Sequence, residues 1–315
     1  MVAIDLDGTL LNSQKRISCE NLMALQEAFD RGVEIVPVTG RNFSFALPIA
    51  EMLPFEVPLV VSNGAVIRSR RGETYLRCLL PVATARHILE ITADFHPYTV
   101  VIYDQPGPGH LRIQAGFKGA SPDKIAPPSS GVPGMFQSAR VASGVPATAP
   151  TPAVSSGTVA TSTWLQRNRA LLQSFPSLLD ALDGDPLEVS FIGPLSVMCK
   201  VVRSLESDLN NSPPSDHGFR LLRTEYPNRD LAILDVINRD CSKGRALEHW
   251  SRLRGIAADE IMAIGDNFND LEMLHFAGLP VVMGNADESL KRNDWALTLD
   301  CDSSGVAHAL RRFVL

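Results

Sequence analysis

Two neighbouring carboxylates near the start of the chain, Asp5 and Asp7, are the residues best suited to chemistry. They belong to the run DLDGTL at residues 5–10, which ends the apolar stretch 2–6. That stretch predicts a buried strand, and ligands of parallel sheets bind beyond the carboxyl ends of strands. Strand alternation would send both side chains the same way, and Gly8 lets the chain turn sharply. Such close carboxylates repel each other, so one tends to stay protonated, and a divalent cation relieves the repulsion. The two carboxylates suit a catalytic pair, in which one is the nucleophile and the other acts as general acid and base. The alternative is that this run is only a turn or part of a calcium-binding loop.

A second candidate is an anion site in the run VTGR at residues 38–41. The run ends the apolar stretch 33–38, which predicts the next strand. The Thr39 hydroxyl and the backbone N–H groups around Gly40 would form an anion site at such a strand-to-helix turn. A plain loop with a capping threonine is the alternative.

Two later clusters supply a cation and further oxygen ligands. Lys243 opens a helix predicted over 243–253, and a lysine is a compact charge suited to a phosphate oxygen, although most lysines at helix starts are only solvated. The run GDNFND at residues 265–270 follows a strand predicted over 261–264 and crowds two carboxylates and two amides into one turn. Oxygen-rich clusters without sulfur suit magnesium. The alternative is a polar turn in which Asp270 caps the next helix.

The elements that position these clusters alternate between strand and helix at both ends of the chain. In the first part Ser18 is predicted to cap a helix, and a strand over 59–61 precedes a hairpin around Gly72. In the last part a helix over 270–276 precedes a strand over 280–283. This pattern predicts an α/β fold with a parallel sheet and helices on both faces. Because each cluster follows a strand of that one sheet, we expect the clusters to meet at its carboxyl edge.

The middle of the chain follows a different pattern. Helices are predicted over 82–95 and 195–209, and strands over 100–103, 187–192 and 231–237. Strands with fewer helices between them indicate an α+β module inserted into the larger domain. We therefore expect three segments, which are core residues 1–80, an inserted cap of residues 81–240 and core residues 241–315.

One stretch of the insert has an unusual composition. Residues 141–163 consist only of Ala, Ser, Gly, Val, Pro and Thr, and the flanking stretch from Pro106 is also rich in Pro and Gly. The segment near 106–163 would bury little apolar surface, so we expect disorder or a loose surface loop. An ordered lid loop or additional edge structure of the insert is the alternative.

Composition and charge narrow the range of partners. Among 315 residues, 45% are hydrophobic and 20% charged, as in a globular protein with a sizeable core. The net charge of -6 gives no broad reason to expect nucleic acid or an anionic membrane as a partner. No run of 18 apolar residues exists, and Asp5 and Asp7 interrupt any signal peptide, so we expect a cytoplasmic protein. The five cysteines form no CxxC pair and are expected to be free thiols, without a zinc site.

The four clusters, in this order, resemble the haloacid dehalogenase (HAD) superfamily of aspartate-dependent phosphatases. The resemblance is strongest with the Cof-type branch, subclass IIB, which carries an α/β cap between the second and third motifs of a Rossmann-like core. It extends through SNGA at 62–65, VMGNA at 282–286 and SGVA at 304–307. It therefore spans most of 1–80 and 240–315 and is weak over the insert. Only four residues precede Asp5, which makes the first strand short for this family.

The resemblance implies a role for each matching residue. Asp5 would attack phosphorus and become an aspartyl phosphate, and Asp7 would protonate the leaving alcohol and then activate water. Mg²⁺ would be bound by the Asp5 side chain, the Asp7 backbone carbonyl and Asp266, and Asp270 would support the metal site or orient Lys243. The phosphoryl oxygens would be bound by Thr39, Gly40, Lys243 and Asn269. Asn63 and Gly64 would form a loop on the substrate side. Metal and lysine together would offset the charge of a phosphoryl group beside a carboxylate.

The expected function is hydrolysis of a small phosphorylated metabolite, with a sugar phosphate as the expected substrate class. A phosphomutase or other phosphotransferase of the same superfamily is one alternative. It would need several basic cap residues facing the site, and the insert offers Arg203, Arg220, Arg223 and Arg229. A non-catalytic phosphometabolite-binding protein is the other alternative, although binding alone does not require two adjacent carboxylates. The sequence indicates no oligomeric state.

Overall fold

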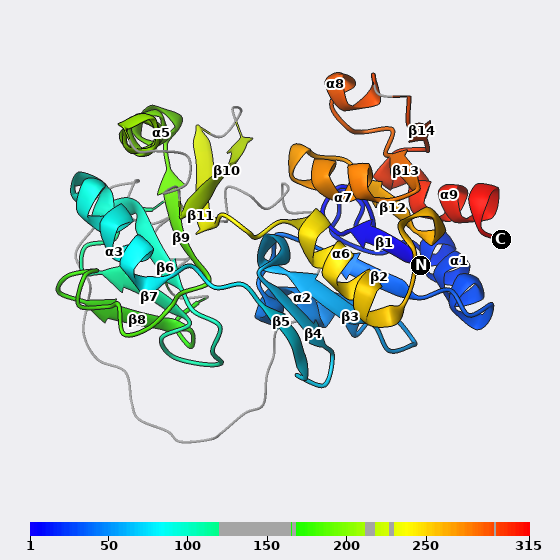
Figure 1. Ribbon diagram of the computed structural model, residues 1–315, viewed down its shortest axis with the longest axis horizontal. Coiled ribbons are helices and arrows are strands. Elements are labelled where there is room, and N and C mark those ends of the chain that lie inside the picture. The colour runs from blue at the N-terminus through cyan, green and yellow to red at the C-terminus, as the bar shows by residue number, and fades with distance from the viewer. Residues whose placement is uncertain (120–164, 166–167, 212–217, 227–229, 293) are drawn as a thin grey trace, which may run out of the picture.

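The structure, a computed structural model, describes residues 1–119, 165, 168–211, 218–226, 230–292 and 294–315. Figure 1 shows two bodies side by side, each built on a sheet of its own. The expected disorder or loose loop in the low-complexity stretch 141–163 lies outside the described residues, as does Arg229. The fold class is α/β, as predicted, with a mainly parallel sheet in one body and an α+β arrangement in the other.

The larger body contains an eight-stranded sheet in the order β14-β13-β12-β1-β2-β3-β4-β5. Its strands are β1 (Val2–Asp5), β2 (Ile35–Val38), β3 (Pro58–Val61), β4 (Val66–Ser69), β5 (Thr74–Arg77), β12 (Met262–Gly265), β13 (Leu279–Val282) and β14 (Ala296–Leu297). All neighbouring pairs are parallel except those that involve the hairpin of β4 and β5. Strand β1 lies at the centre, between β2 and β12, so the two ends of the chain build one sheet.

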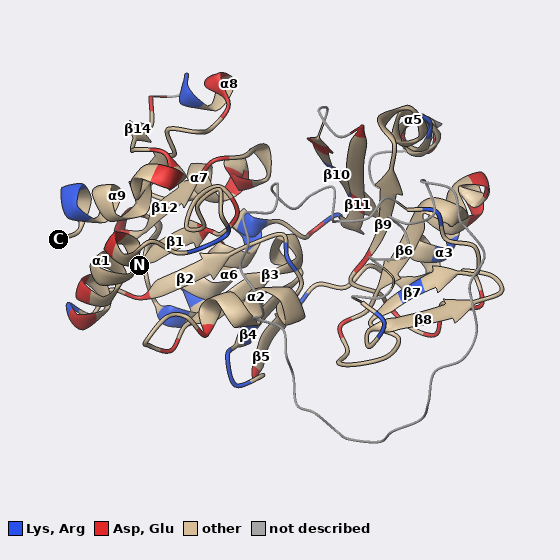
Figure 2. Ribbon diagram, turned by 180° about the vertical axis from the view of Figure 1, so that it is seen from behind, with Lys and Arg blue, Asp and Glu red and all other residues tan. Residues whose placement is uncertain are grey.

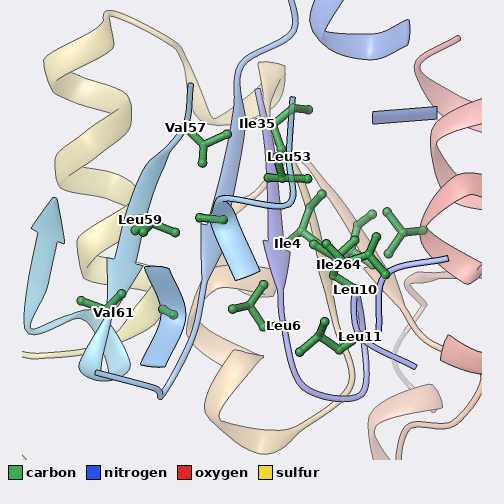
Figure 3. Packing of buried hydrophobic residues seen from close by; sticks show 14 of the residues in the cluster. Ile4, Leu6, Leu10, Leu11, Ile35, Leu53, Val57, Leu59, Val61 and Ile264 are labelled. Atoms are coloured by element: carbon green, nitrogen blue, oxygen red, sulfur yellow. The ribbon is translucent and has the colours of Figure 1, made fainter. Parts of the chain in front are cut away.

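Helices cover both faces of this sheet, because its strands are apolar on both sides. The helices are α1 (Cys19–Asp30), α2 (Phe43–Ala50), α6 (Lys243–Arg254), α7 (Leu271–Phe276), α8 (Glu288–Lys291) and α9 (Gly305–Phe313). On one face Ile4 packs in a cluster with residues of α1 and α9, and on the other Ala3 packs with residues of α6 and α7. Figure 3 shows Ile4 and Ile264 pointing to the same side of the sheet. Ser18 caps α1 as predicted, since its side chain accepts the Asn21 N–H.

The smaller body contains a six-stranded sheet in the order β10-β11-β9-β6-β7-β8. Its elements are β6 (Thr99–Ile102), β7 (Leu111–Gln114), β8 (Leu172–Phe175), β9 (Glu188–Gly193), β10 (Phe219–Tyr226), β11 (Leu231–Asn238), α3 (Val82–Ile91) and α5 (Leu195–Asn211). Every pair is antiparallel except β7 and β8, and residues of α3 and α5 share one hydrophobic cluster with one face of the sheet. The helix predicted over 82–95 was too long, because α3 ends at Ile91 and a 3-10 segment containing Pro97 follows.

Two connections join the bodies, one from β5 to α3 and one from β11 to α6. They lie side by side, because the Asn238 amide donates to the Leu79 carbonyl at 2.7 Å. We propose that the core and the inserted cap divide near residues 80 and 240, within these connections. Figure 2 shows Lys and Arg interleaved with Asp and Glu in both bodies. Among the described residues, no helix combines the length and hydropathy that a membrane crossing requires.

Candidate active site

Three of the four predicted clusters meet because they follow neighbouring parallel strands. The expectation that every cluster follows a strand of one sheet was wrong for Lys243, which opens α6 after β11 of the smaller sheet. Strands β2, β1 and β12 lie adjacent, and Asp5, the last residue of β1, pairs in register with Val38 of β2. The run at 38–41 leaves β2 there, and the run at 265–270 leaves β12 at the same edge. The arrangement is the carboxyl edge of a parallel sheet, where such folds bind ligands.

Asp5, Lys243 and Asp270 form a buried ion cluster at this edge. The Lys243 ammonium donates to Asp5 Oδ1 and to Asp270 Oδ1, both at 2.6 Å. Burial lowers the pKa of Lys243, but Asp270 and Asp5 outweigh it, so the net pKa lies above its usual value and the ammonium stays charged. Buried charges persist only when they are paired. Lys243 is therefore a fixed cation of the site and not a solvated lysine at a helix start.

Asp5, Asp266 and Asp270 bring three carboxyl groups close to the Lys243 ammonium. Burial raises the pKa of Asp5 well above its usual value, Lys243 opposes this, and Asp270 and Asp266 raise it further. Burial and Asp270 raise the pKa of Asp266 to about 6, although Asp266 Oδ1 accepts the Thr9 hydroxyl at 2.9 Å. Oxygens of Asp5, Asp266 and Asp270 all lie within 4.8 Å of one another. Such an oxygen-only set with excess negative charge fits a hard divalent cation such as Mg²⁺.

Asp270 uses its oxygens to hold the turn and the lysine. Its Oδ2 accepts the backbone N–H groups of Asp266 and Asn267, both at 3.0 Å, while Oδ1 binds Lys243. The Asp270 side chain makes no cap hydrogen bond to α7, so the alternative in which it serves only as a helix cap is wrong. Its position suits the second of the two roles expected for it, which is to orient Lys243.

Asp7 lies in a different environment from Asp5. Strand β1 ends at Asp5, so strand alternation does not place the Asp7 side chain. Arg41 binds both Asp7 oxygens at 2.6 and 2.7 Å, and Lys15 binds one of them at 2.7 Å. Burial raises the pKa of Asp7, but Arg41 and Lys15 outweigh it and leave the pKa well below its usual value. The two acids of the first motif are therefore shifted in opposite directions, and the lowered pKa of Asp7 is the reverse of what a general acid needs while Arg41 holds it.

The remaining predicted residues, from the loops at 39–40, 63–64 and 269, form a wall of the site beside Lys243. The Asn269 amide donates to Asn63 Oδ1 at 3.2 Å, and the Asn63 N–H donates to the Thr39 carbonyl at 3.1 Å. A Cβ on Gly40 would lie only 2.9 Å from Asn63 Oδ1. At Gly64, where φ is +97°, a Cβ would lie 2.2 Å from the Ser242 carbonyl, so only glycine fits against the start of α6. The structure thus brings every residue of the predicted phosphate and substrate loops to this edge.

A pocket of about 200 Å³ opens beside this wall, between the two bodies. Its lining combines Asn63, Lys243 and Asn269 with Glu272 of α7 and with Arg220 of β10. Arg220 forms an ion pair with Glu272 and donates to the Cys241 carbonyl at 2.9 Å. The smaller body therefore contributes a cation to the rim of the candidate site.

Several residues of the site were not predicted from the sequence. Arg41 and Thr9 lay inside the motifs, directly after Gly40 and Gly8, and this adjacency was the only signal for them. The Asn285 amide donates to the Gly8 carbonyl at 2.8 Å, and Asn285 lay in the run at 282–286 that supported the resemblance. Lys15 carried no signal in the sequence.

Comparison with known families identifies the fold. The model of the haloacid dehalogenase-like hydrolase family matches residues 2–108 and 201–310, which is more than half of the chain. The chain belongs to the haloacid dehalogenase-like hydrolase family. The resemblance inferred from the motifs is thereby confirmed, and the matched residues include all four motif clusters.

Individual relatives cover this HAD hydrolase almost end to end. The phosphatase YwpJ of Bacillus subtilis is 29% identical over 100% of this chain and 99% of its own length. The pyridoxal phosphate phosphatase YbhA of Escherichia coli is 25% identical over 92% of this chain and 90% of its own length. The solved structure of BT4131, described as a HAD subclass IIB sugar phosphatase, matches with a TM-score of 0.66 at 17% identity, covering 99% and 98% of the two chains. That last match shows a shared fold, including the second body.

Proposed function

We propose that this HAD hydrolase is a Mg²⁺-dependent phosphatase that hydrolyses a small phosphorylated metabolite through an aspartyl phosphate on Asp5. The observation that carries the proposal is the buried Asp5 carboxylate, 2.6 Å from a fixed lysine and clustered with the oxygens of Asp266. A nucleophile, a cation and a hard-metal donor set at one sheet edge are the parts that in-line phosphoryl transfer needs. Its relatives named phosphatases support the same reaction class.

The proposed reaction has two steps. Asp5 attacks phosphorus, the bond from phosphorus to the leaving oxygen breaks, and Asp7 gives that oxygen a proton. Asp7 then takes a proton from a water that attacks the phosphoryl group, which releases inorganic phosphate and restores Asp5. Because Asp7 is ionised beside Arg41, it must take up a proton or leave Arg41 as substrate binds.

The other residues hold charge and orientation. Asp5, Asp266 and the Asp7 carbonyl would hold Mg²⁺, which when bound neutralises charge on the phosphoryl oxygens. We propose that Thr39, Gly40, Lys243 and Asn269 bind those oxygens and that Asp270 keeps Lys243 in place through its 2.6 Å contact. Preorganised donors of this kind stabilise developing charge without reorganisation during the reaction.

The pocket supports a small, polar leaving group. Its volume of about 200 Å³ is below the range of about 300–1,000 Å³ that is usual for ligand sites. Amides of Asn63 and Asn269 and the charges of Arg220 and Glu272 suit hydroxyl groups, as in a sugar phosphate. Leu222, Phe268 and Leu271 add apolar surface to the same lining. The structural relative named a sugar phosphatase supports this class. The five free thiols support our expectation of a reducing, cytoplasmic location.

The two alternatives have less support. Of the described candidates for a basic phosphomutase cap, Arg203 is exposed on α5, and Arg223 pairs with Glu225 and contacts Cys199 of α5. Only Arg220 of these described arginines lines the pocket. A binding protein without catalysis would have no use for a buried Asp5 carboxylate beside Lys243 and a second acid two residues later.

The test is turnover of p-nitrophenyl phosphate by wild type and Asp5→Asn, with Mg²⁺ and after chelation. We expect chelation to stop turnover and Asp5→Asn to lower it by about a thousandfold or more, as loss of a nucleophile does. A thermal melt within a few degrees of wild type would show that the variant is folded. Wild-type turnover by Asp5→Asn would remove the covalent mechanism, and tight phosphate-ester binding without turnover by the metal-loaded wild type would favour the binding protein.

A further inference from the structure

The two connections between the bodies bring two cysteines together. Cys78 follows β5 directly, and Cys241 lies two residues before α6, so the pair is 163 positions apart in sequence. The Cys241 thiol donates to the Cys78 carbonyl at 2.9 Å. One residue further along, the Asn238 amide binds the Leu79 carbonyl at 2.7 Å. The cysteines therefore lie where the chain enters and leaves the smaller body.

The two thiols also differ in a way that suits an attacking and a resolving partner. The side-chain interaction with Cys241 lowers the pKa of Cys78, and the same interaction together with burial raises the pKa of Cys241. Cys78 is half-buried, whereas Cys241 is 1% exposed. A partly exposed thiol with a lowered pKa is the form that reacts with oxidants, and a neighbouring thiol then completes a disulfide.

We propose that Cys78 and Cys241 form a peroxide-sensitive pair whose disulfide links the two connections and restrains the smaller body. The Cys78 thiolate attacks one oxygen of hydrogen peroxide, the O–O bond breaks, and one water leaves once a proton is taken up. The Cys241 sulfur then attacks the resulting sulfenic acid and expels the second water. Two thiols lose two electrons and two protons in all, and the peroxide is reduced to two waters.

The linkage would act on turnover, and this part of the inference rests on the proposed function. Cys241 and Arg220 line the same pocket, so the second connection forms part of its wall. Substrate entry and product release in capped enzymes require the cap to move relative to the core. A covalent bond between both connections would restrict that movement, and reduction would restore it.

The primary test uses the full-length, Mg²⁺-loaded protein and does not depend on activity. The protein is treated with hydrogen peroxide, its remaining thiols are alkylated, and the digest is examined by mass spectrometry. We expect a peptide pair joined through Cys78 and Cys241, which dithiothreitol separates. Recovery of both cysteines as alkylated or singly oxidised peptides, with no joined pair, would overturn the proposal.

Matched variants separate the pair from general oxidation. Cys78→Ser should keep its basal turnover and lose the peroxide response, whereas Cys19→Ser, which alters an exposed thiol on α1, should respond like wild type. Cys241→Ala removes the other thiol of the pair and should abolish the disulfide as well. We expect peroxide to lower wild-type turnover at least tenfold, reversibly. A Cys78–Cys241 disulfide that leaves turnover unchanged would show that it does not restrain the smaller body. A disulfide in a protein that never hydrolyses phosphate esters would mean that only the proposed function had failed.

Discussion

Gly8 brings the backbone so close to Asp266 that no side chain fits between them. Its φ is +89°, and an added Cβ would lie 2.3 Å from Asp266 Oδ2. We predict that Gly8→Ala displaces this carboxylate and lowers the apparent Mg²⁺ affinity at least tenfold, which is about 1.4 kcal/mol. Titration of turnover with Mg²⁺ measures this. Gly72→Ala is the matched control, because Gly72 has φ +91° but no atom of the described residues within 4 Å of an added Cβ. Equal Mg²⁺ affinities in the two variants would contradict the prediction.

Lys243 has a structural role as well as its proposed chemical one. It is the cation that touches both Asp5 and Asp270, which are buried with it. We predict that Lys243→Met lowers the free energy of unfolding by about 3–5 kcal/mol, because it leaves buried carboxylates without a partner. Adding Asp270→Asn should recover part of that loss, since one of the carboxylates is then neutral. Urea unfolding of both single variants and the double variant measures the coupling, and strictly additive losses would show that Lys243 and Asp270 do not act together.

At the residue scale, the sequence was informative wherever a residue type and its place after a strand were sufficient. Asp5, Asp266 and Asn269 lie at the edge where the pattern of strands predicted them, whereas Lys243 reaches that edge from the start of α6, after a strand of the smaller sheet. The pairing of Asp7 with Arg41 was not predictable, because it depends on how the chain continues after β1 ends. Sequence spacing indicates that two acids are close, but their surroundings decide which of them is ionised.

At the element scale, the register of the smaller sheet places a carboxylate where water hardly reaches. Glu188 of β9 pairs opposite Ile102 and Ile237, and it is 6% exposed. Burial raises its pKa well above the usual value, and Asp235, itself raised, adds to the effect. When the pKa of an acid is higher in the folded state, the acid contributes most to the free energy of unfolding below its unfolded pKa, which is about 4.3 for glutamate. This contribution is lost as pH rises through the folded-state pKa.

We therefore predict that Glu188→Gln stabilises the protein at neutral pH. The gain should be about 1 kcal/mol, or roughly 2–4 °C in Tm for a protein of this size, and should vanish below about pH 4, where glutamate is protonated in both states. Thermal melts at several pH values measure this. Glu90→Gln, an exposed glutamate of α3, is the control and should change Tm by less than a degree. A gain that persists unchanged at low pH would exclude titration of Glu188 as the cause.

The elements that were predicted correctly are those whose burial is visible in composition. Strands β1, β2 and β12 are continuous apolar runs, buried on both faces, and all were predicted to within two residues. Strand β10 was missed because charged residues such as Arg223 and Glu225 interrupt its apolar pattern. Helix α2 was missed, and it carries Pro48 in its interior, which breaks the usual helical signal.

At the scale of the whole molecule, the sequence predicted that both ends of the chain build one sheet but not how the smaller body faces it. Parallel pairing of β1 with β12 joins residues about 260 positions apart, and alternation of strands and helices is sufficient to predict such a sheet. The direction of the arginines in the smaller body depends on the register of β10 against β11. A shift of one residue would exchange the two faces of β10.

That register makes Arg220 and Arg223 a natural comparison. They lie on one strand, but Arg220 lines the pocket and pairs with Glu272 of the larger body, whereas Arg223 contacts Cys199 of α5. The Arg220–Glu272 pair is partly exposed, at 33% and 41%, so its worth to stability is only about 0–1 kcal/mol. Its effect should therefore be seen in substrate binding and not in Tm.

We predict that Arg220→Ala raises KM for the sugar phosphates that the wild type hydrolyses about tenfold, equivalent to about 1.4 kcal/mol of binding. Turnover at saturation should stay within about threefold, because Arg220 contacts the leaving-group pocket and not Asp5. Arg223→Ala should leave both constants near wild type, since it removes the same charge from the opposite face of the strand. Steady-state kinetics with p-nitrophenyl phosphate and with a panel of sugar phosphates measures all three proteins. If the two variants raise KM equally, the loss reflects the net charge of the smaller body, and the assignment of Arg220 to the pocket is wrong.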